Sequence, residues 1–213
     1  MKHFVVTLAR GFGSGGKEIA SALAHSLGIH CYENRILTLA SRMSGVEEKV
    51  FVDNNERLPI ANRLAQLTKT MRSIPRHEPF VSDEKLFDYQ RQIILNLAAS
   101  ESCVIVGKCA DWILRGNANV LSVYIEAPRQ HCAARIMQQM SVSRETADRS
   151  IERTDKYRAA YYKHYTGGQS WTNPVNYDLT LNSERLGIDG CVEMIRHCLQ
   201  VKFPIRLNGH PDP

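Results

Sequence analysis

The chain has 213 residues, of which 43% are hydrophobic and 23% charged, a composition that is ordinary for one globular domain. Its 27 basic and 22 acidic residues leave a formal charge of +5, which suits an anion-binding protein but is low for a nucleic-acid binder. No apolar run approaches the roughly 18 residues of a membrane span, so we expect a cytoplasmic protein without a membrane partner. The six cysteines and eight histidines show no spacing typical of a metal site or a redox dithiol.

The first 28 residues predict a strand, a glycine-rich loop and a helix, in that order. Residues 3–9 are β-branched and apolar, as in a buried strand. After the glycines, apolar residues recur at helical spacing as far as Leu27, and Gly28 is the kind of residue that ends a helix in a left-handed conformation.

Helices and strands continue to alternate toward the C-terminus. Pro128 fits the first turn of a helix that follows the strand at 120–125. This alternation predicts an α/β fold of three layers, a parallel sheet with helices on both faces and ligands at the carboxyl ends of the strands. The remaining expected elements are a helix over 83–101, strands over 103–106, 120–125 and 177–182, and a helix over 188–199.

Two stretches interrupt the alternation. Residues 42–80 contain three prolines, one helical pattern and several cations. Residues 141–170 carry six basic residues and four tyrosines, followed by the glycine-containing segment TGGQS. We interpret both as insertions in a single domain over residues 1–203, with residues 204–213 as a C-terminal tail.

The segment GFGSGGK from Gly11 to Lys17 matches the GxxxxGK pattern of phosphate-binding loops. Residues without a Cβ let backbone N–H groups surround an anion, the helix start adds its positive dipole end, and Lys17 can reach the β- and γ-phosphates of ATP. The alternative, an ordinary glycine-rich turn, does not require a lysine at this position. The residues expected to contact ATP are Gly11, Gly13, Ser14, Gly15, Gly16, Lys17 and Glu18.

Glu18 stands where many such loops have a Ser or Thr that binds Mg²⁺. One interpretation is that its carboxylate binds Mg²⁺ directly or through water. The other, which we favour, is that it points away as the first-turn acid that a helix start prefers. Because no acidic residue ends the strand at 103–106, we expect phosphates and water to hold most of the Mg²⁺ coordination sphere.

These motifs together resemble the cytidylate kinase-like family of P-loop proteins, relatives of the nucleoside monophosphate kinases. The resemblance covers nearly the whole chain in the right order. It implies a P-loop nucleoside triphosphate hydrolase fold, ATP and Mg²⁺ as cofactors, an acceptor-side helical region near 42–80 and a lid near 141–170. The segments that carry it are ARGFGSGGKEIA (9–20), CYENRIL (31–37), VIVGKCADWIL (104–114), TDKYRAAYYKHYTG (154–167) and YDLTLNSERLGI (177–188).

The resemblance also implies roles for cationic side chains. Lys17 matches the catalytic phosphate lysine, while Arg153 and Arg158 match lid cations that meet the transferring phosphoryl group. Arg135 is similar to the arginine that precedes the lid in related kinases. The alternative for Arg153 and Arg158 is a solvated helix whose charges are paired with its own acids.

Lys108 and Asp111 fall on a segment that resembles the one with which cytidylate kinases grip the acceptor phosphate. Lys108 replaces the usual arginine, so the positive charge is kept but the bidentate hydrogen bonding of a planar guanidinium to phosphate is lost. Asp111 lies two positions later than in the family pattern. The alternative for both residues is a short helix with exposed charges.

The sequence therefore predicts an ATP-dependent kinase that acts on a nucleoside monophosphate such as CMP or on a similar small phosphorylated molecule. A second hypothesis is a nucleotide-binding module or sensor with little or no phosphoryl transfer, suggested by Glu18. Nucleic-acid binding by residues 141–170 ranks last, because no recognition motif or basic tail accompanies their cations. The sequence does not indicate the oligomeric state.

Overall fold

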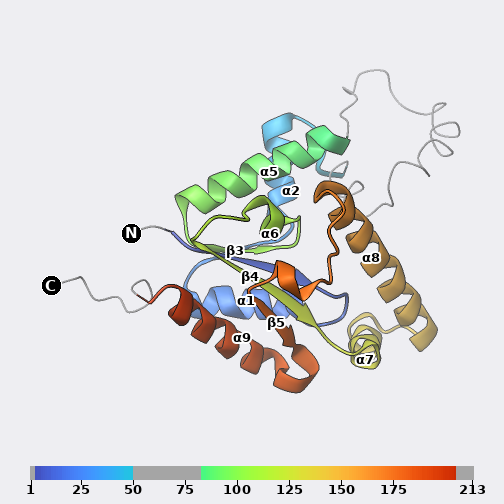
Figure 1. The fold of residues 1–213 in the computed structure, drawn as a ribbon. Coiled ribbons are helices and arrows are strands. Elements are labelled where there is room, and N and C mark those ends of the chain that lie inside the picture. The colour runs from blue at the N-terminus through green and yellow to red at the C-terminus, as the bar shows by residue number, and fades with distance from the viewer. Residues whose placement is uncertain (1–2, 50–82, 205–213) are drawn as a thin grey trace, which may run out of the picture.

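A computed structural model describes residues 3–49 and 83–204 as a three-layer α/β structure (Figure 1). Five parallel strands form one sheet in the order β2-β3-β1-β4-β5. The fold class predicted from the alternation of elements is confirmed. The strands are β1 (Val5–Arg10), β2 (His30–Tyr32), β3 (Cys103–Val106), β4 (Val120–Glu126) and β5 (Leu179–Asn182).

Helices cover both faces of the sheet (Figure 1). On one face α1 packs against α9, on the other α2 packs against α5, and α7 and α8 stand beside the carboxyl ends of the strands. None of the helices within 3–49 and 83–204 is long and apolar enough to cross a bilayer. The helices are α1 (Gly16–Leu27), α2 (Arg35–Ser44), α5 (Asp83–Ser100), α6 (Ala110–Ile113), α7 (Arg129–Met140), α8 (Arg144–Tyr165) and α9 (Ser183–Lys202), with a 3-10 turn, η2 (Pro174–Asn176).

The central strand β1 is buried on both faces, which explains its uninterrupted apolar sequence. Val6 and Leu8 join the core between the sheet and helices α1 and α9, whereas Val5 joins the core beneath α2 and α5. Because β1 lies between β3 and β4, its carboxyl end opens at the middle of the sheet. The glycine loop follows at that point.

Several boundaries differ from the sequence-based expectations. Strand β2 was not predicted, because it is only three residues long and begins with the exposed His30. Pro128 caps α7 from outside rather than lying in its first turn. The last helix begins at Ser183 rather than at residue 188 and is kinked at Gly187, with Asn182 accepting hydrogen bonds from the next backbone N–H groups.

The insertion expected at 141–170 is built mainly by one 22-residue helix, α8. Ser143 caps its start by accepting a hydrogen bond from the Thr146 N–H. Near its end the Tyr165 ring stacks on Phe87 of α5, with the ring centroids 3.9 Å apart. The predicted lid is therefore fastened to the body of the domain at its C-terminal end. Most of the other expected insertion, residues 50–80, and the tail at 205–213 lie outside the described residues.

Ile105 on β3 provides a test of the core. Its side chain is fully buried beneath α2 and α5, so Ile105→Ala should lower the free energy of unfolding by about 2–5 kcal/mol through lost burial and a residual cavity. Val175→Ala, at a side chain that is 86% exposed, should change it by no more than about 0.5 kcal/mol. Urea denaturation measures both values. Similar values for the two variants would contradict the placement of β3.

Candidate active site

The loop from Gly11 to Lys17 joins β1 to α1 and leaves the first turn of that helix without a side-chain cap. Gly13 has φ 86°, and a Cβ at this position would lie 2.8 Å from the Cys132 carbonyl oxygen, so both conformation and space require glycine. Gly15 occupies the N-cap without a side chain to satisfy the N–H groups of the first turn. These groups and the helix dipole form a ready site for an anion.

Ser14 stabilises the loop from within. Its buried hydroxyl donates to the Gly11 carbonyl oxygen at 2.9 Å. The Ser14 carbonyl oxygen in turn accepts a hydrogen bond from Ser183 Oγ, at the start of α9, at 2.6 Å. The loop is thus held in shape by its own side chain and by the helix that packs beside it.

Lys17 extends from the first turn of α1 with 70% of its side chain exposed. Its Nζ lies 2.8 Å from Glu33 Oε2, just after β2. Glu33 Oε1 also lies 3.5 Å from Nη2 of Arg10, the last residue of β1. One carboxylate therefore bridges two cations at the edge of the loop.

Glu18 is turned toward α7. Its carboxylate accepts one hydrogen bond from Arg135 and one from Gln139, each at 2.7 Å. The structure therefore matches the favoured interpretation of Glu18, a carboxylate directed away from the cavity, and brings Arg135 beside the loop. No group of three or more Asp, Glu, His or Cys side chains within 3–49 and 83–204 is arranged to hold a metal ion.

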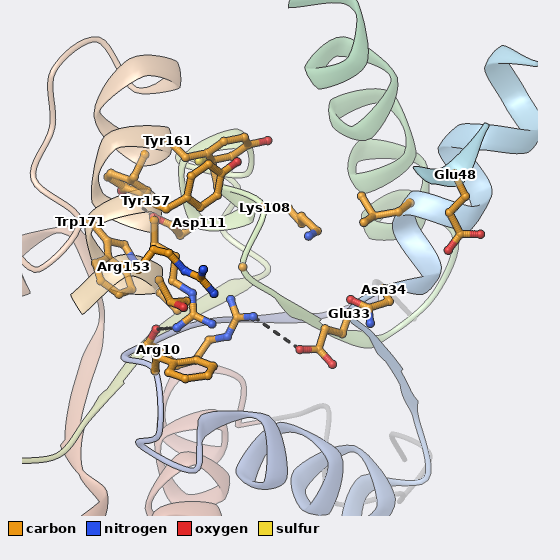
Figure 2. A pocket seen from close by; sticks show the side chains of 18 residues that line it. Arg10, Glu33, Asn34, Glu48, Lys108, Asp111, Arg153, Tyr157, Tyr161 and Trp171 are labelled. Atoms are coloured by element: carbon orange, nitrogen blue, oxygen red, sulfur yellow. Dashed lines mark hydrogen bonds and ion pairs between the residues drawn. The ribbon is translucent and has the colours of Figure 1, made fainter. Parts of the chain in front are cut away.

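A cavity of about 750 Å³ opens at the carboxyl ends of the strands, next to the loop (Figure 2). Lys108, Asp111, Arg153 and Arg158 all line it, so four of the predicted site residues come together from three parts of the chain. Arg135 does not line it. Neither do the residues predicted to contact ATP, which are Gly11, Gly13, Ser14, Gly15, Gly16, Lys17 and Glu18. The other residues of the lining are Ala9, Arg10, Phe12, Glu33, Asn34, Leu37, Glu48, Gly107, Cys109, Thr154, Tyr157, Tyr161, Tyr162 and Trp171.

Helix α8 contacts the start of the glycine loop through an acid and a base. Asp155 Oδ1 accepts the backbone N–H of Phe12 at 2.9 Å, and Arg158 Nη1 donates to the Arg10 carbonyl oxygen at the same distance. Burial raises the pKa of the Asp155 carboxyl and lowers that of the Arg158 guanidinium. Arg158, with 20% of its side chain exposed, is therefore not the solvated charge of the alternative interpretation, although it lies 3.5 Å from Asp155 of its own helix. Arg153 is exposed, as that alternative expects.

Lys108 and Cys109 follow β3 in left-handed conformations, with φ 60° and 54°. Such conformations are strained for residues with a Cβ and are common at functional sites. They turn the chain abruptly into α6, with Lys108 directed toward the cavity (Figure 2). On α6, Asp111 is partly buried and accepts a hydrogen bond from Tyr162 Oη at 2.6 Å. The interpretation of both residues as exposed helix charges is therefore wrong.

Comparison with known proteins decides the family. Residues 5–185 match the model of the cytidylate kinase-like family. The chain belongs to this family. No curated protein matches the chain in sequence.

Solved structures share the fold of this cytidylate kinase-like chain. An uncharacterized protein from Eubacterium ventriosum ATCC 27560 is 23% identical, with a TM-score of 0.68 over 93% of this chain and 99% of that one. TT1252 from Thermus thermophilus is 14% identical, with a TM-score of 0.52 over 95% and 99%. Shikimate kinase from Bacteroides thetaiotaomicron is also 14% identical, with a TM-score of 0.50 over 92% and 98%. The α/β P-loop fold expected from the glycine loop is confirmed.

Sequence reasoning missed several side chains of the site of this kinase-like protein. Arg10 lies in the segment 9–20 and Glu33 in the segment 31–37, but the sequence predicted no role for either residue. A carboxylate such as Glu33, directly after a strand that ends beside a phosphate loop, could have indicated a site residue. This signal could not be used, because strand β2 was not predicted. No sequence pattern indicated that Trp171 lines the cavity, because its position there depends on the path of the chain after α8.

The pH dependence of stability tests the buried state of Asp111. Burial raises the pKa of its carboxyl, and the hydrogen bond from Tyr162 opposes that shift only in part. The folded protein then binds the proton more tightly than the unfolded chain, so the stability contributed by this group decreases as the pH rises through its titration. We expect Asp111→Asn to become more stable relative to the wild type between about pH 3.5 and pH 7.

Asp178 is the matched control of opposite sign. Burial would raise the pKa of its carboxyl, but hydrogen bonds from Lys202 and Ser122 outweigh burial and lower it. Asp178→Asn should therefore become less stable relative to the wild type as the pH rises from about 2 to about 5, because the lowered pKa places this titration at or below the ordinary carboxyl range. Urea denaturation at several pH values measures both differences. If the difference in stability from the wild type changed with pH in the same direction for both variants, the raised pKa of Asp111 would be contradicted.

Proposed function

We propose that this chain is an ATP-dependent kinase that transfers a phosphoryl group to a nucleoside monophosphate such as CMP or to a similar small phosphorylated molecule. The observation that carries the proposal is the open anion site at the start of α1, directly beside a cavity lined by cations. The first offers a place for the triphosphate of ATP. The second offers a place for an acceptor that also carries negative charge.

The lining of the cavity supports an acceptor with a phosphate and a flat ring. Lys108 and Arg153 reach it from opposite sides, β3 and α8 (Figure 2). The aromatic side chains Tyr157, Tyr161 and Trp171 line it as well. Cations suit the phosphate, and aromatic faces suit stacking of a nucleobase. A volume of about 750 Å³ is within the usual range for small-molecule sites.

The proposed reaction needs no covalent intermediate with the protein. An oxygen of the acceptor phosphate attacks the γ-phosphorus of ATP, and the bond from that phosphorus to the bridging oxygen breaks, so that ADP leaves with the bonding electrons. Negative charge spreads over the oxygens of the transferring group, where Lys17, Arg153 and Arg158 would stabilise it. In this proposal Mg²⁺ is held mainly by phosphates and water, because Glu18 is engaged by Arg135.

The alternative is a nucleotide-binding module or sensor with little or no transfer. The engaged carboxylate of Glu18 favours it, since this position lacks the hydroxyl that commonly binds Mg²⁺. Both hypotheses require ATP binding, so product formation separates them. A screen for ADP release over nucleoside monophosphates, deoxynucleotides and phosphorylated metabolites would favour the kinase if one acceptor accelerates release, and the sensor if none does.

Lys17→Ala tests the role of the loop. The variant removes the ammonium group that would contact the β- and γ-phosphates, so we expect phosphoryl transfer to fall by at least about 100-fold. The fold should persist, because the Lys17 side chain is largely exposed. Coupled detection of ADP measures the rate, and circular dichroism checks the fold.

Lys163→Ala is the matched control. Lys163 is exposed in the last turn of α8 and does not line the cavity. Its replacement should leave the rate within about twofold of the wild type, since an isolated surface charge contributes little. Turnover retained by Lys17→Ala, or lost equally in both variants, would refute the proposed role of the loop.

A further inference from the structure

The side chain of Arg10 is enclosed by other parts of the chain, with 18% of its surface exposed. Arg10 ends β1 immediately before the glycine loop, and its side chain runs between two glycines from different parts of the chain. A Cβ on Gly16 would lie 2.5 Å from Arg10 Cβ, and a Cβ on Gly107 would overlap its Nη1. The stem of the Arg10 side chain therefore packs closely against Gly16 and its guanidinium against Gly107, and the side chain lines the cavity (Figure 2).

The charge of Arg10 is only partly compensated. Burial, and then the neighbouring Arg158, lower the pKa of Arg10 to about 10, so it still carries its charge at neutral pH. Its ion pair with Glu33 spans 3.5 Å, and the other oxygen of that carboxylate lies 2.8 Å from Lys17. The Asp155 carboxylate also stabilises the charge of Arg10, but its ion-pair partner Glu33 is shared with Lys17. A largely buried cation whose ion-pair partner is shared with another cation is costly to the fold. An anionic ligand would complete its pairing.

Glu33 also indicates where such a ligand would bind. Because one carboxylate contacts both Lys17 and Arg10, the two cations are close enough to bind different oxygens of one group of similar size. A phosphoryl group has that size and carries more charge. Lys17 belongs to the glycine loop and Arg10 lines the cavity, so the group between them stands at the junction of the two.

We propose that Arg10 binds the phosphoryl group that passes between the loop and the cavity, as a second cation beside Lys17, and that Glu33 holds both cations until that group arrives. The proposal rests on the proposed function and assigns a residue to its transfer step. Arg10 forms no covalent bond; it neutralises charge on the non-bridging oxygens. A different role, in which Arg10 only supports the turn at Gly107, predicts other results below.

The test compares Arg10→Met with Arg10→Lys. Methionine keeps much of the length of the side chain without its charge, and lysine keeps the charge without the planar fork. Arg149→Met is the control, since Arg149 is 70% exposed and pairs with Glu145 one helical turn away. Each variant is titrated with ADP and with the non-hydrolysable triphosphate AMP-PNP, and the rate of transfer is measured with the best acceptor.

If Arg10 contacts the γ-phosphoryl group, Arg10→Met should weaken AMP-PNP binding by about tenfold or more and leave ADP binding within about twofold. The rate of transfer should fall by about 100-fold, with partial recovery in Arg10→Lys. The control should match the wild type. A purely supporting role would instead weaken ADP and AMP-PNP by the same factor.

Equal effects on the two nucleotides, or no effect on either, would overturn the proposal. The binding comparison needs no turnover. If the wild type binds AMP-PNP but transfers nothing to any acceptor, the proposed function fails, whereas the assignment of Arg10 is still decided by the difference between AMP-PNP and ADP. The two failures are therefore distinguishable.

Discussion

The arrangement on which the rest of the site depends is the open start of α1 at the carboxyl end of the central strand. A helix leaves its first N–H groups without intrahelical partners, and here a glycine at the N-cap offers no side chain to satisfy them. The parallel order of the sheet brings the ends of β2 and β3 to the same edge. The residues that follow these strands, Glu33 and Lys108, consequently lie around one cavity beside the loop.

The acids and bases around the loop form ion pairs, two of which join different elements of the fold and one of which lies within α8. In each pair, a cation that could bind phosphate contacts a carboxylate. That carboxylate comes from a distant part of the chain or from a neighbouring helical turn. These carboxylates lower the free-energy cost of holding several cations close together in the folded protein. Phosphate oxygens would then compete with these carboxylates for the same donors. The pairs are Glu33 with Lys17, Glu18 with Arg135, and Asp155 with Arg158.

Local patterns were sufficient to predict four of the five strands, the loop and most of the described helices, because apolar periodicity and glycine chemistry act over short stretches of chain. Arg158 was assigned to the site by the resemblance to the family and not by these patterns, and its contact with the Arg10 carbonyl oxygen spans 148 positions in sequence. They could not predict how side chains from distant elements meet. The close packing of Arg10 against Gly107, for example, is revealed only by the folded chain. Likewise, Glu18 could be assigned only once α7 was seen to approach the loop with Arg135.

The central claim is that the loop from Gly11 to Lys17 binds polyphosphate, and a calorimetric titration of the wild-type protein with ATP and with adenosine in the presence of Mg²⁺ tests it most directly. Several charge-assisted hydrogen bonds from open N–H groups and one ammonium group should make ATP bind at least about 100-fold more tightly than adenosine. Equal affinity for the two ligands, or no binding of either, would contradict the account.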